Sequence, residues 1–290
     1  MPNPTISAGY PKALLDFAVS RGADRRTLIE RSEILPADLS NQDNRIPLAN
    51  YMALLQAGIE LCNEPALSLL FGEAVRIQDI SIVGMIGGLD SIESGREQLN
   101  RYSLLAIDAD DGGTADASEF VRENGEVGFK LTGKIYADYP LLTESGFARG
   151  VCGAREMLAS TPGFANVRFP KAIHFTHKEP SYRAEYDRIF GVPLVFESHM
   201  NAFLIDEAML SIRWPQGNPY LSEILSARAD ELLKSLESSK TTRGRVENLL
   251  LPILHTGQAS MDTIAGKLGV SRQSLFRKLK SEGVTFEKVL

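Results

Sequence analysis

The residues of this chain that could do chemistry gather near its carboxyl end, on one helix predicted to begin after Ser271. Their polar and basic side chains recur at positions that share the outer face of a helix. Arginine can donate two hydrogen bonds to O6 and N7 of guanine, and glutamine can pair with adenine in a similar way. The residues predicted to contact DNA are Ser271, Arg272, Gln273, Ser274, Arg277, Lys278 and Lys280.

Two kinds of contact are expected from this helix. Outward residues near the amino end of such a helix reach the base edges in the major groove. Arg272, Gln273 and Arg277 are therefore predicted to read sequence. The other members of the set are predicted to touch phosphates, which fixes the register of a protein on DNA without reading its sequence.

A second, shorter helix is expected to hold this one in place. Ser260 is suited to cap it, because a serine hydroxyl accepts a bond from a free N–H of the first turn. Ala265 is small where the two helices would cross, and Gly269 lies at the turn, where a positive φ is expected. Leu275 and Leu279 are predicted to face inward. This is the layout of a helix-turn-helix unit.

The charge of the chain is unevenly placed. Residues 240–290 hold nine Lys or Arg against four Asp or Glu, a net of +5, although the whole chain carries −6. The preceding residues therefore carry −11. A basic tail on an acidic body fits a phosphate-facing module joined to a domain that does not touch DNA. The alternative is a helical bundle whose basic face is merely solvated.

The length of 290 residues predicts two domains. Residues 1–237 are expected to form a helix-rich domain with a small mixed sheet, of the α+β class. Residues 238–244 are polar and without pattern, which predicts a linker. Residues 245–290 are expected to form an all-helical domain that contains the helix-turn-helix.

Several stretches of the first domain have the features of strands. Residues 117–123 and 126–133 alternate between apolar and polar side chains, which predicts a β-hairpin. Short strands are also expected at residues 172–177 and 193–196. Residues 203–212, by contrast, are interpreted as a helix.

Residues 260–290 resemble the first helix-turn-helix of AraC/XylS-type transcription regulators. Residues 177–191, 193–196 and 201–204 are similar to the arabinose-binding-type amino-terminal domain in the branch of ornithine-utilisation and virulence regulators. The resemblance implies a cytoplasmic, sequence-specific regulator of transcription, with double-stranded DNA as its partner. It further implies that the first domain binds a small-molecule effector or forms a homodimer. Activation and repression both stay open.

One feature departs from the family pattern. The family carries two helix-turn-helix units joined by a long helix, whereas this chain ends at Leu290, where that helix is expected. A trimmed or incomplete sequence is therefore expected. One unit alone should bind DNA far more weakly than a pair. Phe286, Val289 and Leu290 are expected to lack packing partners.

A ligand pocket is expected near the hairpin and the helix that contains Thr143. Apolar and aromatic side chains gather there, as they do in most small-molecule sites. The alternative is that these side chains are ordinary core. The candidate ligand-binding residues are Phe129, Leu131, Tyr136, Tyr139 and His174.

No metal site, cofactor or catalytic motif is expected. Residues 108–119 imitate part of a calcium loop, but Gly112 stands at a ligand position and a strand follows, so an acidic turn is preferred. Cys62 and Cys152 stand alone, which fits a reducing compartment. Neither a signal peptide nor a membrane-spanning run is expected. The runner-up function is a small-molecule-binding or enzymatic domain whose helical tail contacts proteins.

Overall fold

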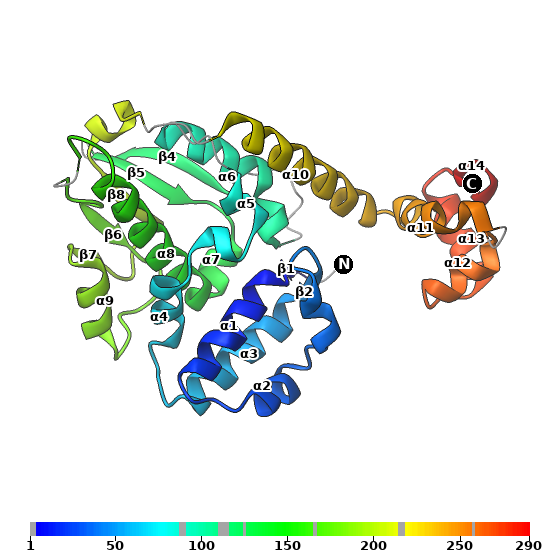
Figure 1. Ribbon diagram of the computed structural model, residues 1–290, viewed down its shortest axis with the longest axis horizontal. Coiled ribbons are helices and arrows are strands. Elements are labelled where there is room, and N and C mark those ends of the chain that lie inside the picture. Colours follow the sequence, from blue (N-terminus) through cyan, green and yellow to red (C-terminus); the bar gives the residue numbers. More distant parts are fainter. Residues whose placement is uncertain are drawn as a thin grey trace. The chain divides into compact units, whose positions relative to one another are not determined.

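The computed structural model describes residues 4–86, 91–109, 116–123, 126–164, 167–213, 218–256 and 259–290. Its contacts divide the chain into two compact units, Asn3–Ser226 and Ala227–Leu290, so the division falls within helix α10 (Pro219–Ser239). Both are dominated by helices, and the first also contains the sheets (Figure 1), as the α+β prediction requires.

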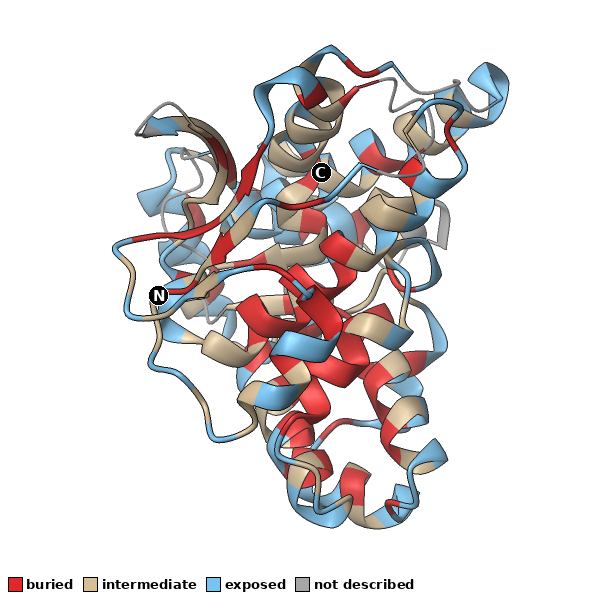
Figure 2. Ribbon diagram, turned by 90° about the vertical axis from the view of Figure 1, so that its left-hand side faces the viewer, coloured by how far each residue is buried: buried red, intermediate tan, exposed pale blue. Residues whose placement is uncertain are grey.

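The amino-terminal part of the first unit combines helices with a three-stranded antiparallel sheet, in which β1 lies between β2 and β3. Leu14, Leu28 and Leu54 come from three successive helices and are at most 1% exposed. The buried residues gather where these helices face one another (Figure 2). The elements are β1 (Thr5–Ser7), α1 (Gly9–Ser20), α2 (Arg25–Ser32), η1 (Pro36–Ser40), β2 (Arg45–Pro47), α3 (Leu48–Leu61), α4 (Leu67–Ala74) and β3 (Ile107–Asp108).

The rest of the first unit is built on a five-stranded sheet of order β4-β5-β8-β6-β7. All its neighbouring strands are antiparallel except β6 and β7, so the sheet is mixed. Ser118 pairs with Leu131 and Arg122 with Val127, which confirms the predicted hairpin. The strands are β4 (Ser118–Glu123), β5 (Glu126–Leu131), β6 (Ala172–His174), β7 (Leu194–Val195) and β8 (Asn201–Ile205).

Helix α8 packs on this sheet through aromatic side chains. The ring of Phe147, on α8, lies 4.5 Å from the ring of Phe203, on β8. At Gly150, one turn further along α8, the backbone comes so close to the sheet that an added Cβ would lie 3.5 Å from Phe203. The remaining elements of the unit are η2 (Ile77–Asp79), α5 (Ile82–Met85), α6 (Ile92–Ala106), α7 (Ile135–Asp138), α8 (Pro140–Ala159), α9 (Arg183–Phe190) and η3 (Glu207–Ser211).

The helix predicted for residues 203–212 is wrong for its first residues, because Phe203–Ile205 belong to a strand and only Glu207–Ser211 form a short 3₁₀ helix. Phe203 belongs to β8 and pairs with Phe129 of β5 on one side and Ile173 of β6 on the other. A strand buried within a sheet can carry the same continuous apolar run as a buried helix, so the pattern alone could not separate them. The strand ends where Asp206 Oδ1 accepts the Ala208 N–H at 2.9 Å and starts η3.

The second unit contains the remainder of α10 and, among its described residues, five short helical segments around their own core. Val246, Leu250, Ile264, Leu275 and Leu279 are at most 2% exposed. The segments that follow α10 are α11 (Thr242–Leu250), η4 (Leu251–Thr256), α12 (Met261–Lys267), α13 (Arg272–Ser281) and α14 (Phe286–Val289).

Most of the stretch predicted as a linker, residues 238–244, is helical. Helix α10 continues through Ser239, and α11 begins at Thr242. The Thr241 hydroxyl accepts the Gly244 N–H at 3.0 Å, so it caps α11. These polar residues, which lack a regular spacing of apolar side chains, thus form the end of one helix and the start of the next. Composition alone does not distinguish such a stretch from a linker.

The expectation that the last apolar residues lack partners is wrong for two of the three. Phe286 is only 5% exposed, and Val289 packs against the same core. Both side chains are covered because α14 contacts α11. Leu290 alone of the three stays exposed, at 55%.

Candidate nucleic-acid interface and ligand pocket

Two serines begin the helices of the predicted helix-turn-helix. The Ser260 hydroxyl accepts the Thr263 N–H at 3.2 Å, and the Ser271 hydroxyl accepts the Ser274 N–H at 3.1 Å. Each bond satisfies a donor that its helix leaves free. Ser271 thus begins α13 as a cap, and its hydroxyl also donates to that of Ser274 at 3.0 Å.

The turn between α12 and α13 has the predicted geometry. Gly269 has φ +65°, the left-handed region that favours glycine. The next residue, Val270, donates its N–H to the Ala265 carbonyl at 3.0 Å, which folds the chain back after α12. Ala265 is 3% exposed, as expected where two helices pack closely.

Helix α13 separates its apolar side from its charged side. Leu275 and Leu279 are buried in the core of the second unit. The predicted DNA-contacting residues all lie on this helix or its cap, and six are exposed while one, Ser274, is half-buried. The exposed members are Ser271, Arg272, Gln273, Arg277, Lys278 and Lys280.

Two features of this surface were not predicted from the sequence. The Arg272 guanidinium forms an ion pair with Asp262 of α12, with 2.7 Å between Nη1 and Oδ2, and both side chains are 65% exposed. Phe276, also on α13, is an aromatic side chain 49% exposed to solvent. Its position between Leu275 and Arg277 could have flagged it, because Phe276 does not share the inward spacing of Leu275 and Leu279.

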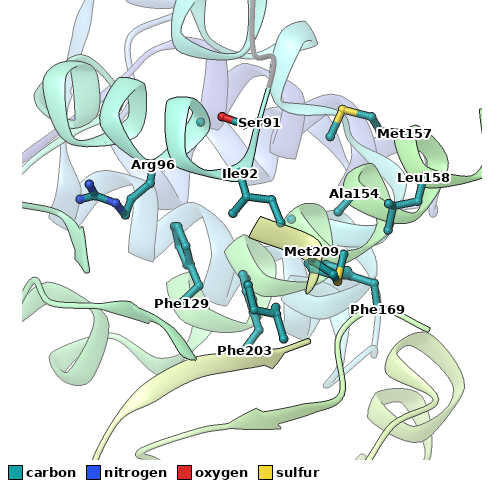
Figure 3. A pocket seen from close by; sticks show the side chains of 13 residues that line it. Ser91, Ile92, Arg96, Phe129, Ala154, Met157, Leu158, Phe169, Phe203 and Met209 are labelled. Atoms are coloured by element: carbon teal, nitrogen blue, oxygen red, sulfur yellow. The ribbon is translucent and has the colours of Figure 1, made fainter. Parts of the chain in front are cut away.

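A cavity of about 250 Å³ lies in the first unit, between α6, α8 and the sheet (Figure 3). The Phe129 and Phe203 rings form part of one wall and stack with their centroids 5.7 Å apart. Most of the lining is apolar. The residues that line the cavity are Ser91, Ile92, Gly95, Arg96, Phe129, Gly150, Ala154, Met157, Leu158, Phe169, Phe203, Ile205 and Met209.

The polar side chains of this lining belong to Ser91 and Arg96. Ser91 and Ser94 exchange hydrogen bonds between hydroxyl and backbone N–H at 3.1 Å, forming the capping box of α6. Arg96 donates from Nη2 to Glu93 at 2.9 Å, and its guanidinium lies 5.4 Å from the centre of the Phe120 ring. Its Nε is buried and has no hydrogen-bond partner among the described residues.

One of the five candidate ligand-binding residues, Phe129, lines this cavity. Leu131 lies further along β5 and packs half-buried against the core beneath the sheet. Tyr136 and Tyr139 pack against the core of the amino-terminal helices instead. His174 Nδ1 lies 3.1 Å from the Ser198 hydroxyl. A ligand contact by these four residues stays a prediction.

A buried carboxyl group, that of Glu144, lies on α8 and was not predicted from the sequence. Glu144 is 2% exposed and accepts from the Tyr182 hydroxyl at 2.9 and 3.1 Å. Burial raises the pKa of Glu144 to about 7, although hydrogen bonds from Tyr186 and Tyr182 act in the opposite direction. The available signal in the sequence was an acid between the apolar residues Leu142 and Phe147 of a predicted helix.

The described parts of the chain contain no group of three or more His, Cys, Asp or Glu side chains that could hold a metal ion. Of the calcium-like stretch 108–119, residues 110–115 lie outside the described residues. Within the same described ranges, every helix is too short or too polar to cross a membrane.

The sequence of this chain is similar to those of known transcription regulators. Residues 22–213 match the family described as the arabinose-binding domain of AraC transcription regulators, N-terminal. The ornithine utilization regulator of Pseudomonas aeruginosa is 25% identical over 294 residues, which cover 98% of this chain and 81% of that protein. The regulator VirS of Mycobacterium tuberculosis is also 25% identical, over 93% of this chain and 76% of its own length.

Among solved structures, the transcriptional regulator CdpR from Pseudomonas aeruginosa aligns with 91% of this chain and 79% of its own, at 18% identity and a TM-score of 0.44. The family assignment depends on the sequence match, which spans more than half of the chain. The chain belongs to the AraC family of transcription regulators with an arabinose-binding-type amino-terminal domain.

Proposed function

We propose that this regulator binds double-stranded DNA by placing α13 in the major groove. The observation that carries the proposal is the division of α13 into a buried side, with Leu275 and Leu279, and an exposed cationic side. A helix anchored in this way can approach base pairs without disturbing the core that holds it.

Within α13, Arg272, Gln273 and Arg277 are the proposed base-reading residues. They are exposed and lie near the amino end of the helix or one turn beyond it. Lys278 and Lys280 are proposed to contact phosphates, because they lie in the last turns of the helix. The hydroxyl groups of Ser271 and Ser274 already form a hydrogen bond with each other. Their contacts to phosphates would therefore use the hydrogen-bonding capacity that remains on these hydroxyl groups.

Control of DNA binding is assigned to residues 1–237. We infer that this part binds a small-molecule effector and forms a homodimer, and that it is not an enzyme. An effector that binds one arrangement of the domains more tightly than another shifts the population toward it, which changes how the DNA-reading helices are presented. A cytoplasmic location follows from the proposal, since its relatives are bacterial proteins and its partner is DNA.

Fluorescence anisotropy with DNA fragments selected from a random pool tests the DNA-binding proposal. Each bidentate contact to a base contributes about 1–3 kcal/mol, so Arg277→Ala should weaken binding to selected DNA by about 5- to 150-fold. Lys278→Ala should weaken binding to all sequences and reduce the salt dependence by about one charge. Arg26→Ala, on the exposed surface of α2, is the matched control.

Two results would contradict the proposal. The first is salt-dependent binding that survives the combined Arg272→Ala and Arg277→Ala change. The second is the absence of DNA binding together with turnover or ligand-induced stabilisation, which would support the runner-up function of an enzymatic or ligand-binding domain.

A further inference from the structure

We propose that the cavity between α6, α8 and the sheet binds an apolar molecule that carries a single carboxylate. The apolar part would lie among the phenylalanine and methionine side chains, and the carboxylate would lie at Arg96. The inference rests on the proposed function, because it names the chemical class of the effector that controls the regulator.

The walls of the cavity select for an apolar ligand. Phe129, Phe169 and Phe203 supply aromatic surface from the sheet side, and Met157 and Met209 supply flexible thioethers that adapt to irregular shapes. Among the residues that the structure describes, no acidic side chain lines the cavity. A ligand ammonium or a row of sugar hydroxyls would therefore lose its hydrogen bonds to water without replacement, which opposes binding of amino acids and sugars.

Arg96 is the one charged residue among the described residues of the lining. Its Nε is buried without a hydrogen-bond partner among the described residues, while its Nη2 is held by Glu93. Buried donors in folded proteins are nearly always paired, so this one calls for an acceptor. A carboxylate oxygen can accept such a bond, and a hydrogen bond between charged groups is stronger than one between neutral groups.

Figure 3 shows how such a ligand would lie. Arg96 is at one end of the cavity, above Phe129, with its guanidinium turned away from the middle. Met157 and Leu158 are at the opposite end, and Ile92 lies between the two ends. A carboxylate that accepts a bond from the Arg96 Nε would lie at that end, with the apolar tail toward Met157.

Small residues on the two helices keep the cavity open. Gly95 lines it from α6, and Gly150 and Ala154 line it from α8. A larger side chain at position 154 would occupy the space without disturbing a charge. An apolar void destabilises a protein because its lining lacks contacts, so filling it from within should also stabilise the fold.

Isothermal titration calorimetry of the full chain with decanoate and decanol tests the proposal. The two probes differ in the charged head, and decanoate is used below its micelle concentration. Decanoate should bind about tenfold more tightly than decanol, the size of a hydrogen bond to a charged group. Arg96→Gln should abolish that preference, whereas Arg76→Gln, which removes an exposed arginine that pairs with Glu156, should retain it.

A second variant keeps the test independent of Arg96. Ala154→Leu should raise the unfolding temperature of the unliganded chain and abolish binding of both probes. The proposal is overturned if neither probe binds the unaltered chain, if decanol binds as tightly as decanoate, or if Ala154→Leu leaves binding unchanged.

DNA binding is measured on the same samples by anisotropy. If neither probe binds but DNA binding still depends on α13, the proposed ligand is wrong and the proposed DNA-binding function is unaffected. If decanoate binds but DNA does not, the proposed DNA-binding function is wrong and the proposed ligand of the cavity is supported.

Discussion

The Glu282 carboxylate accepts a hydrogen bond from the Thr242 backbone N–H at 2.7 Å. Its other oxygen accepts the Arg243 N–H at 2.8 Å. Thr242 and Arg243 begin α11, where backbone N–H groups have no partner within their own helix. Since Glu282 directly follows α13, this one side chain ties the end of the proposed DNA-reading helix to the start of α11.

Replacing Glu282 with alanine should destabilise the second unit by about 1 kcal/mol, the typical loss for an N-terminal helix cap. Partial burial alone would raise the pKa of Glu282, but the hydrogen bonds from Thr242 and Arg243 outweigh it and lower the pKa below its usual value. The stabilisation is thus present above the unfolded-state pKa and is lost as pH falls through the folded-state pKa.

Hydrogen exchange of amides in α11 and α13, measured from neutral to acidic pH, checks this prediction. Glu237→Ala removes an exposed carboxylate from α10 and is the control. If the amides of the Glu282→Ala variant and of the unaltered chain exchange equally slowly at neutral pH, the hydrogen bonds to Glu282 do not stabilise the second unit.

The turn between α12 and α13 offers a matched pair of glycines. Both Gly266 and Gly269 have open space where a Cβ would lie, but only Gly269 has positive φ. Gly269→Ala should therefore destabilise the second unit by about 1–2 kcal/mol through backbone strain. Gly266→Ala, in the α12 helix, should stabilise it by up to about 1 kcal/mol.

Urea unfolding followed by circular dichroism at several wavelengths measures both glycine variants. Effects of the same sign and size would mean that the left-handed turn conformation does not decide the stability of this unit.

The ion pair between Asp262 and Arg272 should limit non-specific DNA binding. Both side chains are largely exposed, so the pair itself contributes only about 0–1 kcal/mol to folding. Asp262→Asn removes a negative charge from the proposed DNA-facing surface and should tighten binding to random-sequence DNA by about threefold at low salt.

Anisotropy with random-sequence DNA over a salt series measures the change at Asp262. Glu237→Gln, which neutralises a distant exposed acid, should leave the affinity nearly unchanged. Weaker binding by Asp262→Asn would instead mean that Asp262 holds Arg272 in its binding conformation.

The buried acid Glu144 should make the first unit less stable as pH rises. Burial raises its folded-state pKa to about 7, above the ordinary 4.5, against hydrogen bonds from Tyr186 and Tyr182. The folded chain therefore keeps a proton that the unfolded chain loses, and stability falls as pH rises between these two values. Glu144→Gln cannot ionise and should flatten that slope.

Thermal unfolding between pH 5 and pH 8 compares Glu144→Gln with Glu156→Gln, which alters an exposed acid on the same helix. The relative stability of the Glu144→Gln variant should increase with pH, at about 1.4 kcal/mol per pH unit or less. Parallel pH profiles for the two variants and the unaltered chain would contradict the prediction.

The cavity between α6, α8 and the sheet shows which residues the sequence alone could not bring together. Phe129 was found because strand alternation places it on an inner face. Arg96 and Met209 border the same cavity but lie far from Phe129 in the sequence. No sequence pattern connects the elements that carry these three residues. Only the sheet order, which sets β8 beside β5, brings Phe203 against Phe129 and closes that wall.

The sequence by itself determined the helix-turn-helix, since its signals act within about one helical turn: the caps Ser260 and Ser271, the turn at Gly269, and the i,i+4 leucines of α13. The tertiary structure alone decided that Phe203 belongs to a strand and that Phe286 is buried. These outcomes depend on backbone pairing and side-chain burial between residues distant in sequence. Local propensity leaves such outcomes open, because the same apolar run satisfies either conformation until a partner pairs with it.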